Sequence, residues 1–309
     1  MKVLFIGFGS IARKHIAAFK SLPQQFNFYA LRSSQLSKEI EGVISITSWA
    51  DVPKDIAFVI IANPTNLHVQ ALEQCVERKL PIMVEKPVAN EMEGLADIVK
   101  SLEKESIPSY VSCNLRFLPV LQLLHGKIKS NNRRINEVNV YCGSDLRKWR
   151  PGADYKQTYS ANESEGGGVH LDLFHELDYI VWIFGMPLGW RGIRRSNSTL
   201  QISAADYAHY HLFYKNYTAS VSLNYYRQDS KRQIEVLFDD ETWVIDLLQG
   251  TVRSNNNLLF SAGDQGIALT YSAQAKHVIE MLSSKVESIN PIAQSIEILK
   301  ICLSSEKIN

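Results

Sequence analysis

The 309-residue chain has little of several features that mark particular classes of protein. Its four cysteines lie far apart and form no CxxC pair, which argues against a zinc knuckle or a CxxC redox motif. Free thiols are typical of a reducing compartment, so we expect a cytoplasmic protein. No apolar run approaches the roughly 18 residues of a membrane span, and no apolar segment with a cleavage site follows the N-terminus. We therefore expect no membrane partner.

An excess of one charge is also missing. The 33 Lys and Arg residues stand against 32 Asp and Glu, which gives a formal net charge of +1. This balance argues against a nucleic-acid binder and leaves room for a small anionic ligand. Hydrophobic residues make up 45% and charged residues 21% of the chain, as in ordinary globular proteins, and the length predicts two domains.

Residues 1–117 alternate between strand and helix patterns. We expect strands at residues 3–6, 26–31, 57–62, 82–84 and 108–113. Helical patterns lie between them at residues 10–21, 68–79 and 90–105. The run at 57–62, AFVIIA, is apolar throughout, as in a strand that is buried on both faces of a parallel sheet. Strands that alternate with helices predict an α/β domain with a doubly wound parallel sheet.

The pattern changes after residue 117, and we assign residues 118–309 to a second domain. One helix is expected to run from the three glycines at 166–168 to about residue 185. Residues 190–260 read as β-segments, with hairpin signals at 215–216 and 239–240, so this sheet is expected to be mainly antiparallel. Two helical patterns close the chain.

A dinucleotide fingerprint lies at the start of the first domain. Gly7, Gly9 and Ala12 fit the pattern G-x-G-x-x-G/A directly after an apolar strand and at the start of a helix. The first glycine allows the tight turn, the second lets the backbone approach a pyrophosphate, and Ala12 keeps the helix close to the strand. The pyrophosphate would lie on the helix N-terminus at Ser10 and Ile11. An ordinary strand–turn–helix is the alternative interpretation of this string.

The end of the second strand favours NADP(H). An NAD-binding site usually has Asp or Glu here for the ribose 2′-hydroxyl, and this chain has none. Arg32, Ser33 and Ser34 suit a 2′-phosphate instead. We therefore predict NADP(H), with NAD(H) as the second choice, and the alternative is that Arg32 is a solvated loop residue.

Two further motifs carry a family resemblance. One is Val84-Glu85-Lys86-Pro87, and the other is the segment GGGVHLDLFHELD at residues 166–178. Together with the fingerprint, and with Asn114-Leu115-Arg116-Phe117 at the domain boundary, they resemble the glucose–fructose oxidoreductase/inositol dehydrogenase family (Gfo/Idh/MocA). The loop at residues 147–161 resembles the subgroup of this family that is associated with surface-sugar biosynthesis.

The resemblance implies a fold, a reaction and a set of site residues. The fold is an N-terminal Rossmann domain followed by an α/β domain with an open-faced antiparallel sheet. Most family members transfer a hydride between a nicotinamide and a carbinol carbon of a sugar or cyclitol. By resemblance, Lys86, Asp172 and His175 are catalytic, although the histidine follows the aspartate by three residues rather than the more usual four. Further cofactor contacts are expected at Asn63, Pro64, Thr65, His68, Glu85, Lys86 and Asn114.

Hydride transfer at a carbinol needs a group that takes the hydroxyl proton. Lys86 could take this proton itself, or it could polarise the oxygen while His175 moves the proton. At about 100° per residue, Asp172, His175 and Tyr179 share one face of the expected helix. A surface pair on an amphipathic helix is the alternative for Asp172 and His175.

The loop before the three glycines combines cations, aromatic rings and hydroxyls. Arginine binds carboxylate or phosphate in bidentate fashion, and Trp or Tyr can stack on a sugar or a base. We therefore expect an anionic carbohydrate as substrate, although these residues could instead pack the loop or cover a subunit interface. The expected substrate contacts are Arg116, Arg147, Trp149, Arg150, Tyr155, Tyr159 and Tyr179.

The expected function is hydride transfer between NADP(H) and the carbinol or keto carbon of a sugar, in particular an acidic or nucleotide-activated sugar. The alternatives are a hydrolase, epimerase or lyase with a tightly held redox cofactor, and a non-catalytic NADP-binding protein.

We expect a homodimer or homotetramer formed through the antiparallel sheet, because an exposed sheet with tyrosines is prone to associate. Zinc binding is an alternative for a cluster of four histidines and one aspartate, namely His170, Asp172, His175, His209 and His211. Because His175-Glu176 lacks the second histidine of H-E-x-x-H, we expect no metal.

Overall fold

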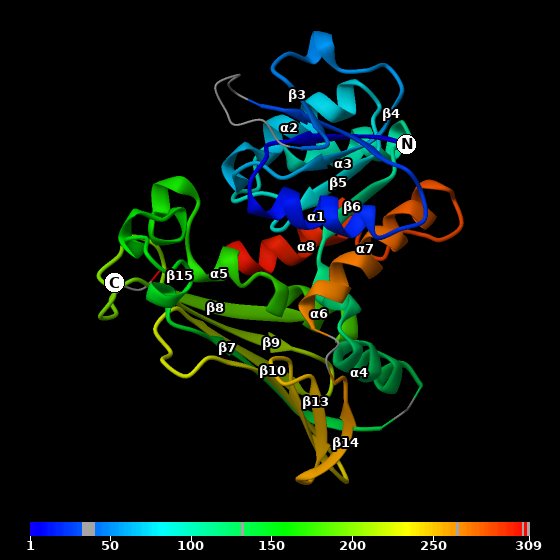
Figure 1. Cartoon of the computed structure of the whole chain (residues 1–309). Helices are drawn as coiled ribbons and strands as arrows, with labels where there is room; N and C mark the ends of the chain where they lie inside the picture. Colours follow the sequence, from blue (N-terminus) through cyan, green and yellow to red (C-terminus); the bar gives the residue numbers. More distant parts are fainter. Residues whose placement is uncertain (33–40, 131–132, 264–265, 305, 308–309) are drawn as a thin grey trace. The chain divides into compact units, whose positions relative to one another are not determined.

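A computed structural model of the chain describes residues 1–32, 41–130, 133–263, 266–304 and 306–307 (Figure 1). It divides into two compact units. Unit 1 comprises Met1–Asn114 and Ala268–Leu299, and unit 2 comprises Leu115–Ile267 and the residues from Lys300 onward. The closing helices of the chain are α7 (Ile267–Leu282) and α8 (Ile292–Leu303), so most of their length belongs to unit 1.

Unit 1 is built on a six-stranded parallel sheet with the order β3-β2-β1-β4-β5-β6. Its strands are β1 (Lys2–Ile6), β2 (Asn27–Leu31), β3 (Val43–Ile46), β4 (Ile56–Ile61), β5 (Ile82–Glu85) and β6 (Ser109–Ser112). The strand order reverses between β1 and β4, which is the topological switch point where open α/β sheets bind ligands. The expected Rossmann-type sheet is therefore confirmed.

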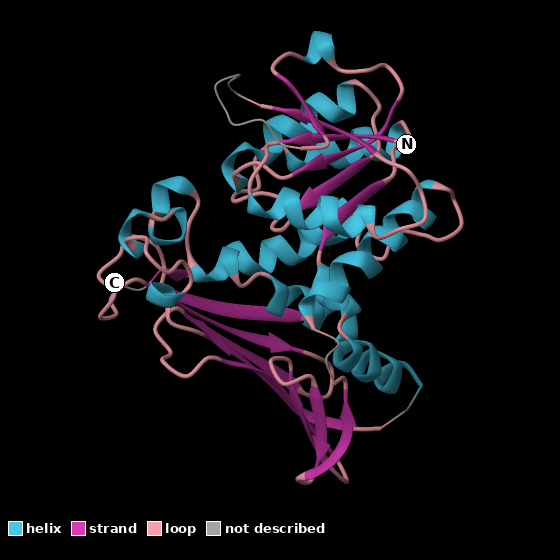
Figure 2. Ribbon diagram, viewed as in Figure 1, coloured by secondary structure: helices cyan, strands magenta, loops and turns pink. Residues whose placement is uncertain are grey.

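Helices cover both faces of this sheet (Figures 1 and 2). They are α1 (Ser10–Lys20), α2 (His68–Glu77), α3 (Leu95–Lys104) and α7, with short 3₁₀ turns at Trp49–Asp51 and Thr65–Leu67. Phe19 from α1 packs its ring on Phe58 of β4, with 5.4 Å between ring centroids. Ala275 and Val278 of α7 are buried in the same hydrophobic cluster. The strands β1 and β4 are apolar and buried along almost their whole length, so α1, and with it the glycine turn, packs against the sheet.

Unit 2 contains a nine-stranded sheet with the order β14-β13-β12-β11-β7-β10-β9-β8-β15. The pairs β10–β7 and β15–β8 are parallel and the other pairs are antiparallel, so the mainly antiparallel sheet is confirmed. The strands are β7 (Ile135–Gly143), β8 (Gly189–Arg195), β9 (Tyr207–Phe213), β10 (Thr218–Asn224), β11 (Lys231–Phe238), β12 (Thr242–Asp246), β13 (Thr251–Ser254), β14 (Asn257–Ser261) and β15 (Glu306–Lys307).

Side chains of this sheet alternate between a buried face and a partly exposed face. Tyr210 and Val221 are fully buried, whereas His209 and Ser222, their neighbours in β9 and β10, are partly exposed. The helices of unit 2 are α4 (Pro119–Ser130), α5 (Val169–Asp172) and α6 (His175–Phe184), and α5 lies against β9 and β10. Short 3₁₀ turns lie at Asn114–Phe117, Leu146–Lys148, Tyr155–Gln157, Tyr159–Ala161 and Glu163–Glu165.

The single helix expected after the three glycines is wrong in one respect. The segment forms two helices, α5 and α6, separated by Leu173 and Phe174. Leu173 leaves the helical region at φ −97° and ψ +32°, and Glu176 N–H bonds to the carbonyl of Leu173, three residues back. Because the i−4 ladder is broken here, the 100° spacing does not relate Asp172 to His175.

Candidate active site

The glycine turn after β1 leads into α1, whose N-terminus has no side-chain cap. Gly7 has a φ of +82°, and a Cβ there would lie 2.6 Å from Cα of Asn63. A Cβ on Gly9, the N-cap of α1, would meet no atom within 4 Å. No side chain caps this helix end, and its first turn has no acidic residue. The free N–H groups and the helix dipole therefore suit an anion.

The residues around this turn also fit a dinucleotide. Ala12 is fully buried between helix and sheet, Ser10 is exposed, and Ile11 is partly exposed. Oδ1 of Asn63 is buried without a hydrogen-bond partner among the described residues. Since buried polar atoms are rarely left without a partner, this oxygen fits a donor on a bound ligand.

Arg32 lies just beyond the end of β2, where the 2′-substituent of a bound adenosine is expected. Its backbone N–H donates to the carbonyl of Ile46, and its guanidinium lies 3.5 Å from Oγ of Ser45 on β3. The side chain is partly exposed. Ser33 and Ser34, the other expected 2′-phosphate contacts, lie outside the described residues.

The buried side chain of His68 contacts the loop after β4. The ring of His68 is 1% exposed, and its two nitrogens lie 3.0 Å from the carbonyl oxygens of Asn63 and Pro87. Burial lowers the pKa of this imidazole, against the opposing effect of the two carbonyls. His68 thus ties together the loops that follow β4 and β5. In the loop after β4, Pro64 is exposed and Thr65 is partly exposed.

Glu85 and Lys86 stand at the carboxyl end of β5. His15 of α1 donates from Nε2 to Oε1 of Glu85 at 2.5 Å, and the two side chains are 1% and 12% exposed. Burial acts to raise the pKa of Glu85, but the His15 hydrogen bond, Ser112 and the Lys86 charge outweigh it, so the pKa is lowered. Glu85 is therefore an ionised carboxylate beside Lys86.

Asn114, an expected cofactor contact, is hydrogen-bonded to a residue of α7. Its side-chain amide donates to Oγ1 of Thr270 at 2.7 Å, and both residues are buried in unit 1.

In unit 2, a polar cluster forms around Asp172 at the end of α5. The Asp172 carboxylate accepts hydrogen bonds from the hydroxyls of Tyr159 at 3.0 Å and Tyr225 at 2.5 Å. The guanidinium of Arg150 lies 5.1 Å above the Tyr159 ring, and Trp149 meets Tyr225 edge-on at 5.2 Å. We call these five residues the Asp172 cluster. Burial, followed by the Asp172 charge, raises the pKa of Tyr159 to about 12, so its hydroxyl is a donor at neutral pH.

His175 lies near this cluster in sequence, as the first residue of α6, and is partly exposed. The fully buried Tyr225 was not expected from the sequence, because it approaches Asp172 from the end of β10, 53 residues away. His15 was not expected either. A histidine on the apolar side of α1, between Ala12 and Ile16, was the signal that could have found it.

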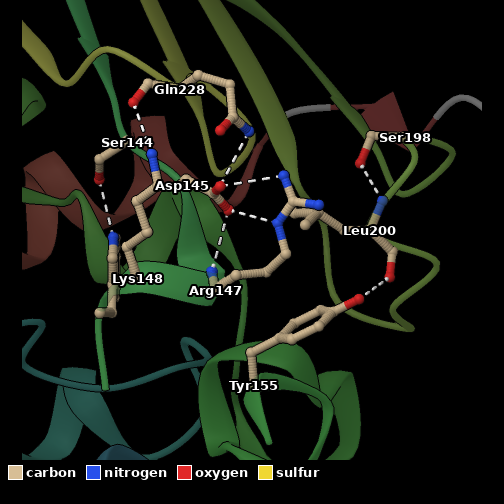
Figure 3. A network of polar contacts seen from close by, with 9 residues as sticks. Ser144, Asp145, Arg147, Lys148, Tyr155, Ser198, Leu200 and Gln228 are labelled. Atoms are coloured by element: carbon tan, nitrogen blue, oxygen red, sulfur yellow. Dashed lines mark hydrogen bonds and ion pairs between the residues drawn. The ribbon is translucent and has the colours of Figure 1, made fainter. Parts of the chain in front are cut away.

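Arg147 and Tyr155 both form hydrogen bonds with other residues of unit 2 (Figure 3). Arg147 forms a bidentate ion pair with Asp145 at 2.9 and 3.0 Å, and Gln228 donates to the same carboxylate. The Arg147 hydrogen bond is the main reason that the pKa of Asp145 is lowered. The hydroxyl of Tyr155 donates to the carbonyl of Leu200. Arg150 is therefore better placed than Arg147 to offer positive charge to a ligand.

Arg116 and Tyr179 lie in the interior of unit 2, both 0% exposed. Arg116 forms a bidentate ion pair with Asp178, which is 1% exposed, at 2.9 and 2.7 Å. Burial, with the charge of Glu176, raises the pKa of Tyr179. Arg116 thus contacts α6 through Asp178, and Tyr179 is itself a residue of α6. Neither side chain reaches solvent.

The histidines considered as metal ligands bond to serines. His209 Nδ1 lies 2.9 Å from Oγ of Ser222, and His211 Nδ1 lies 3.3 Å from Oγ of Ser220. Within the described ranges, no three His, Cys, Asp or Glu side chains gather as metal ligands do. Among the helices in those ranges, none is both long and apolar enough to cross a membrane.

Comparison with known proteins supports the features of both units. Residues 1–112 match the model of the Gfo/Idh/MocA oxidoreductase family, described as having an NAD-binding Rossmann fold. The uncharacterized oxidoreductase YrbE of Bacillus subtilis is 25% identical over 198 residues, and the rhizopine catabolism protein MocA of Rhizobium meliloti is 26% identical over 196 residues. These matches cover 58% and 60% of the chain but only 52% and 58% of the two relatives.

Solved structures share the fold over almost the whole chain. Levoglucosan dehydrogenase in complex with NADH superposes with a TM-score of 0.84 at 17% identity, covering 98% of this chain and 95% of the other. The WlbA dehydrogenase of Chromobacterium violaceum, in complex with NADH and UDP-GlcNAcA, gives a TM-score of 0.81 at 19% identity, covering 98% and 92%. The family match covers the glycine turn and the Glu85-Lys86 motif, so residues 1–112 are similar to the NAD-binding Rossmann domain of the Gfo/Idh/MocA oxidoreductases, and the solved structures show the same two-part fold over the rest of the chain.

Proposed function

We propose that the protein is an oxidoreductase that transfers a hydride between NADP(H) and the carbinol or keto carbon of a sugar. The observation that carries this proposal is the placement of the site residues at one edge of the unit 1 sheet. The glycine turn, Arg32, the Asn63 loop and Lys86 follow the carboxyl ends of β1, β2, β4 and β5, four neighbouring strands at the switch point.

The residues of unit 1 fit a nicotinamide dinucleotide. When bound, this cofactor accepts or donates the hydride. Gly7, Gly9 and the N-terminus of α1 bind its pyrophosphate, and Oδ1 of Asn63 accepts a hydrogen bond from a ribose hydroxyl. Arg32 binds a 2′-phosphate, which is the basis for NADP(H) over NAD(H). Structural relatives that crystallised with NADH are the reason that NAD(H) is the second choice.

Lys86 is the proposed group that acts on the reacting oxygen from unit 1. Beside the Glu85 carboxylate, its side chain either moves the hydroxyl proton or holds positive charge against the developing alkoxide. Asp172 and His175 are the proposed catalytic groups of unit 2. Because Asp172 accepts two tyrosine hydroxyls, its role is to orient donors, which leaves His175 as the proton carrier on that side.

An acidic or nucleotide-activated sugar is the proposed substrate class. In the Asp172 cluster, the Arg150 guanidinium offers charge to a carboxylate or phosphate, while Trp149 and Tyr159 offer rings to a sugar or base. The structural relative crystallised with UDP-GlcNAcA is consistent with this class.

The partly exposed face of the unit 2 sheet, with Tyr141, His209 and His211, supports a homodimer or homotetramer.

A cofactor-reduction screen tests the proposed function. Sugars, sugar acids and nucleotide sugars are incubated with the protein and either NAD⁺ or NADP⁺, and nicotinamide absorbance is followed. We expect steady, stoichiometric reduction with an anionic sugar, faster with NADP⁺. Substrate conversion without any net change in absorbance would contradict the proposal and indicate a hydrolase, epimerase or lyase with a recycled cofactor.

A further inference from the structure

Helix α7 packs on unit 1 with a stripe of polar side chains as well as with the apolar residues Ala275 and Val278. The stripe consists of Thr270, Gln274 and His277, which follow one another at helical spacing and are 1%, 0% and 8% exposed. A helix that covers a sheet usually buries an apolar stripe. Buried polar groups need hydrogen-bond partners, so the stripe must meet polar groups on the neighbouring strand.

These partners lie on β6 and directly after it. The hydroxyl of Tyr110 donates to Oε1 of Gln274 at 3.2 Å, and Nε2 of Gln274 donates to Oγ of Ser112 at 3.0 Å. Nδ2 of Asn114 donates to Oγ1 of Thr270 at 2.7 Å, although these two residues are 156 positions apart in the sequence. Such a network specifies one position of α7, because a shift along the helix axis would leave several buried groups without partners.

Asn114, at one end of this network, lies at the ligand edge of the sheet. Ser112 pairs with Glu85 in the ladder between β6 and β5, so the residues after both strands emerge at the same carboxyl edge. Lys86 directly follows Glu85, and Asn114 follows Ser112 by two residues. The side chain of Asn114 is therefore supplied by the strand next to the one that supplies Lys86.

The strand order indicates which half of a dinucleotide approaches this position. In the sheet, β2 with Arg32 lies on one side of the glycine turn after β1, and β5 and β6 lie on the other side. With the pyrophosphate at the glycine turn and the adenosine near Arg32, the nicotinamide half extends toward β5 and β6.

We propose that Thr270 is a positioning residue for Asn114, whose side-chain amide it holds in the orientation that contacts the nicotinamide half of the cofactor. This role rests on the proposed function, in which unit 1 binds a nicotinamide dinucleotide. An asparagine amide has a donor nitrogen and an acceptor oxygen. Because Nδ2 donates to the Thr270 hydroxyl, the plane of the amide is fixed and Oδ1 points away from Thr270. The ligand group that fits Oδ1 is a donor, either a ribose hydroxyl or the carboxamide N–H of the nicotinamide.

Loss of the Thr270 hydroxyl should affect one half of the cofactor only. Nδ2 of Asn114 would lose its acceptor in a buried environment, so the amide would rotate toward another partner. The nicotinamide half would then lose a hydrogen bond, which corresponds to about 3- to 10-fold in affinity. The adenosine half, at the glycine turn and Arg32, has no contact with this amide and should bind as before.

The test compares two ligands that share the adenosine half. Calorimetric titration of the full chain gives the Kd for NADPH and for 2′,5′-ADP, which lacks the nicotinamide and its ribose. For Thr270→Val we expect the Kd for NADPH to rise about 3- to 10-fold and that for 2′,5′-ADP to stay within about twofold. Thr270→Ser keeps the hydroxyl and should bind both ligands as wild type does. An unchanged ratio of the two Kd values in Thr270→Val would overturn the inference.

Two further comparisons separate positioning from stability. Tyr110→Phe removes one hydroxyl from the same contact between α7 and β6, so it should lower the Tm but leave the ratio of the two Kd values unchanged. In Asn114→Ala protein, Thr270→Val should have no further effect on this ratio, because the amide that it positions is gone. A ratio that changes as much in Tyr110→Phe, or losses that add in the double variant, would contradict the inference. If Thr270→Val does not fold, Thr270→Ala takes its place with the same expected ratio.

The titrations also distinguish a failure of this role from a failure of the proposed function. If the wild type binds neither NADPH nor NADH, the proposed function fails and the role of Thr270 fails with it. If it binds NADH alone, NADH and AMP replace NADPH and 2′,5′-ADP, with the same expected ratios. If a dinucleotide binds and all variants keep the wild-type ratio, only the role of Thr270 is refuted.

Discussion

The buried ion pair between Arg116 and Asp178 should contribute more to stability than to substrate binding, although Arg116 is a substrate candidate by sequence. Both side chains are at most 1% exposed, and two hydrogen bonds of 2.9 and 2.7 Å join them. Changing Asp178→Asn removes the carboxylate charge that lies beside the buried guanidinium. Breaking one partner of such a pair costs about 3–5 kcal/mol, a large part of the roughly 5–15 kcal/mol that stabilises a domain.

The assay is urea unfolding followed by tryptophan fluorescence. Trp182 lies 5.8 Å from the Arg116 guanidinium and reports on this region. The double variant Arg116→Met/Asp178→Leu should recover most of the loss, because it removes both charges and keeps the volume. A loss below about 1 kcal/mol for Asp178→Asn, or a double variant that loses the sum of the two single changes, would refute the reasoning.

The remaining predictions concern unit 1. Gly9→Ala should fold with near wild-type Tm, because its Cβ meets no atom, and yet weaken NADPH binding in a fluorescence titration, whereas Gly7→Ala should lower the Tm, since its Cβ would strike Asn63. Arg32→Asp should reduce the NADP⁺ to NAD⁺ ratio of kcat/KM by about 10- to 100-fold, and an unchanged ratio would remove Arg32 from the 2′-phosphate site. The lowered pKa of Glu85 means that its stabilisation is present above the unfolded value of about 4.3 and is lost as the pH falls through the folded value. The free energy of unfolding should therefore fall as the pH drops below about 4.3 in wild type, and fall less in Glu85→Gln.

Local sequence patterns were sufficient for the parts of the fold that depend on local interactions. The apolar run of β4 and the glycine turn before α1 predict the parallel sheet and its ligand edge, because strand burial and a positive φ at Gly7 are set by nearby residues. The family resemblance added the open-faced sheet of unit 2, and the alternating burial of β9 and β10 agrees with it.

Contacts between distant residues were not predictable in this way. The break at Leu173 interrupts a segment with an unbroken helical pattern, so helix periodicity gave no sign of it. Tyr225 reaches Asp172 only because β10 ends beside α5, and His15 reaches Glu85 only through packing of α1 on the sheet. Arg147 differs, because its partner Asp145 lies two residues away, and an Asp-x-Arg pairing could have been weighed against a substrate role.

The measurement that tests the central claim most directly is the turnover of Lys86→Ala with the sugar found in the screen. The account predicts that wild-type protein changes nicotinamide absorbance steadily with substrate, and that Lys86→Ala loses most of this rate, about 100-fold or more, while its Kd for NADPH changes little. Turnover at the wild-type rate in Lys86→Ala would contradict both roles proposed for the lysine, and with them the proposed reaction site.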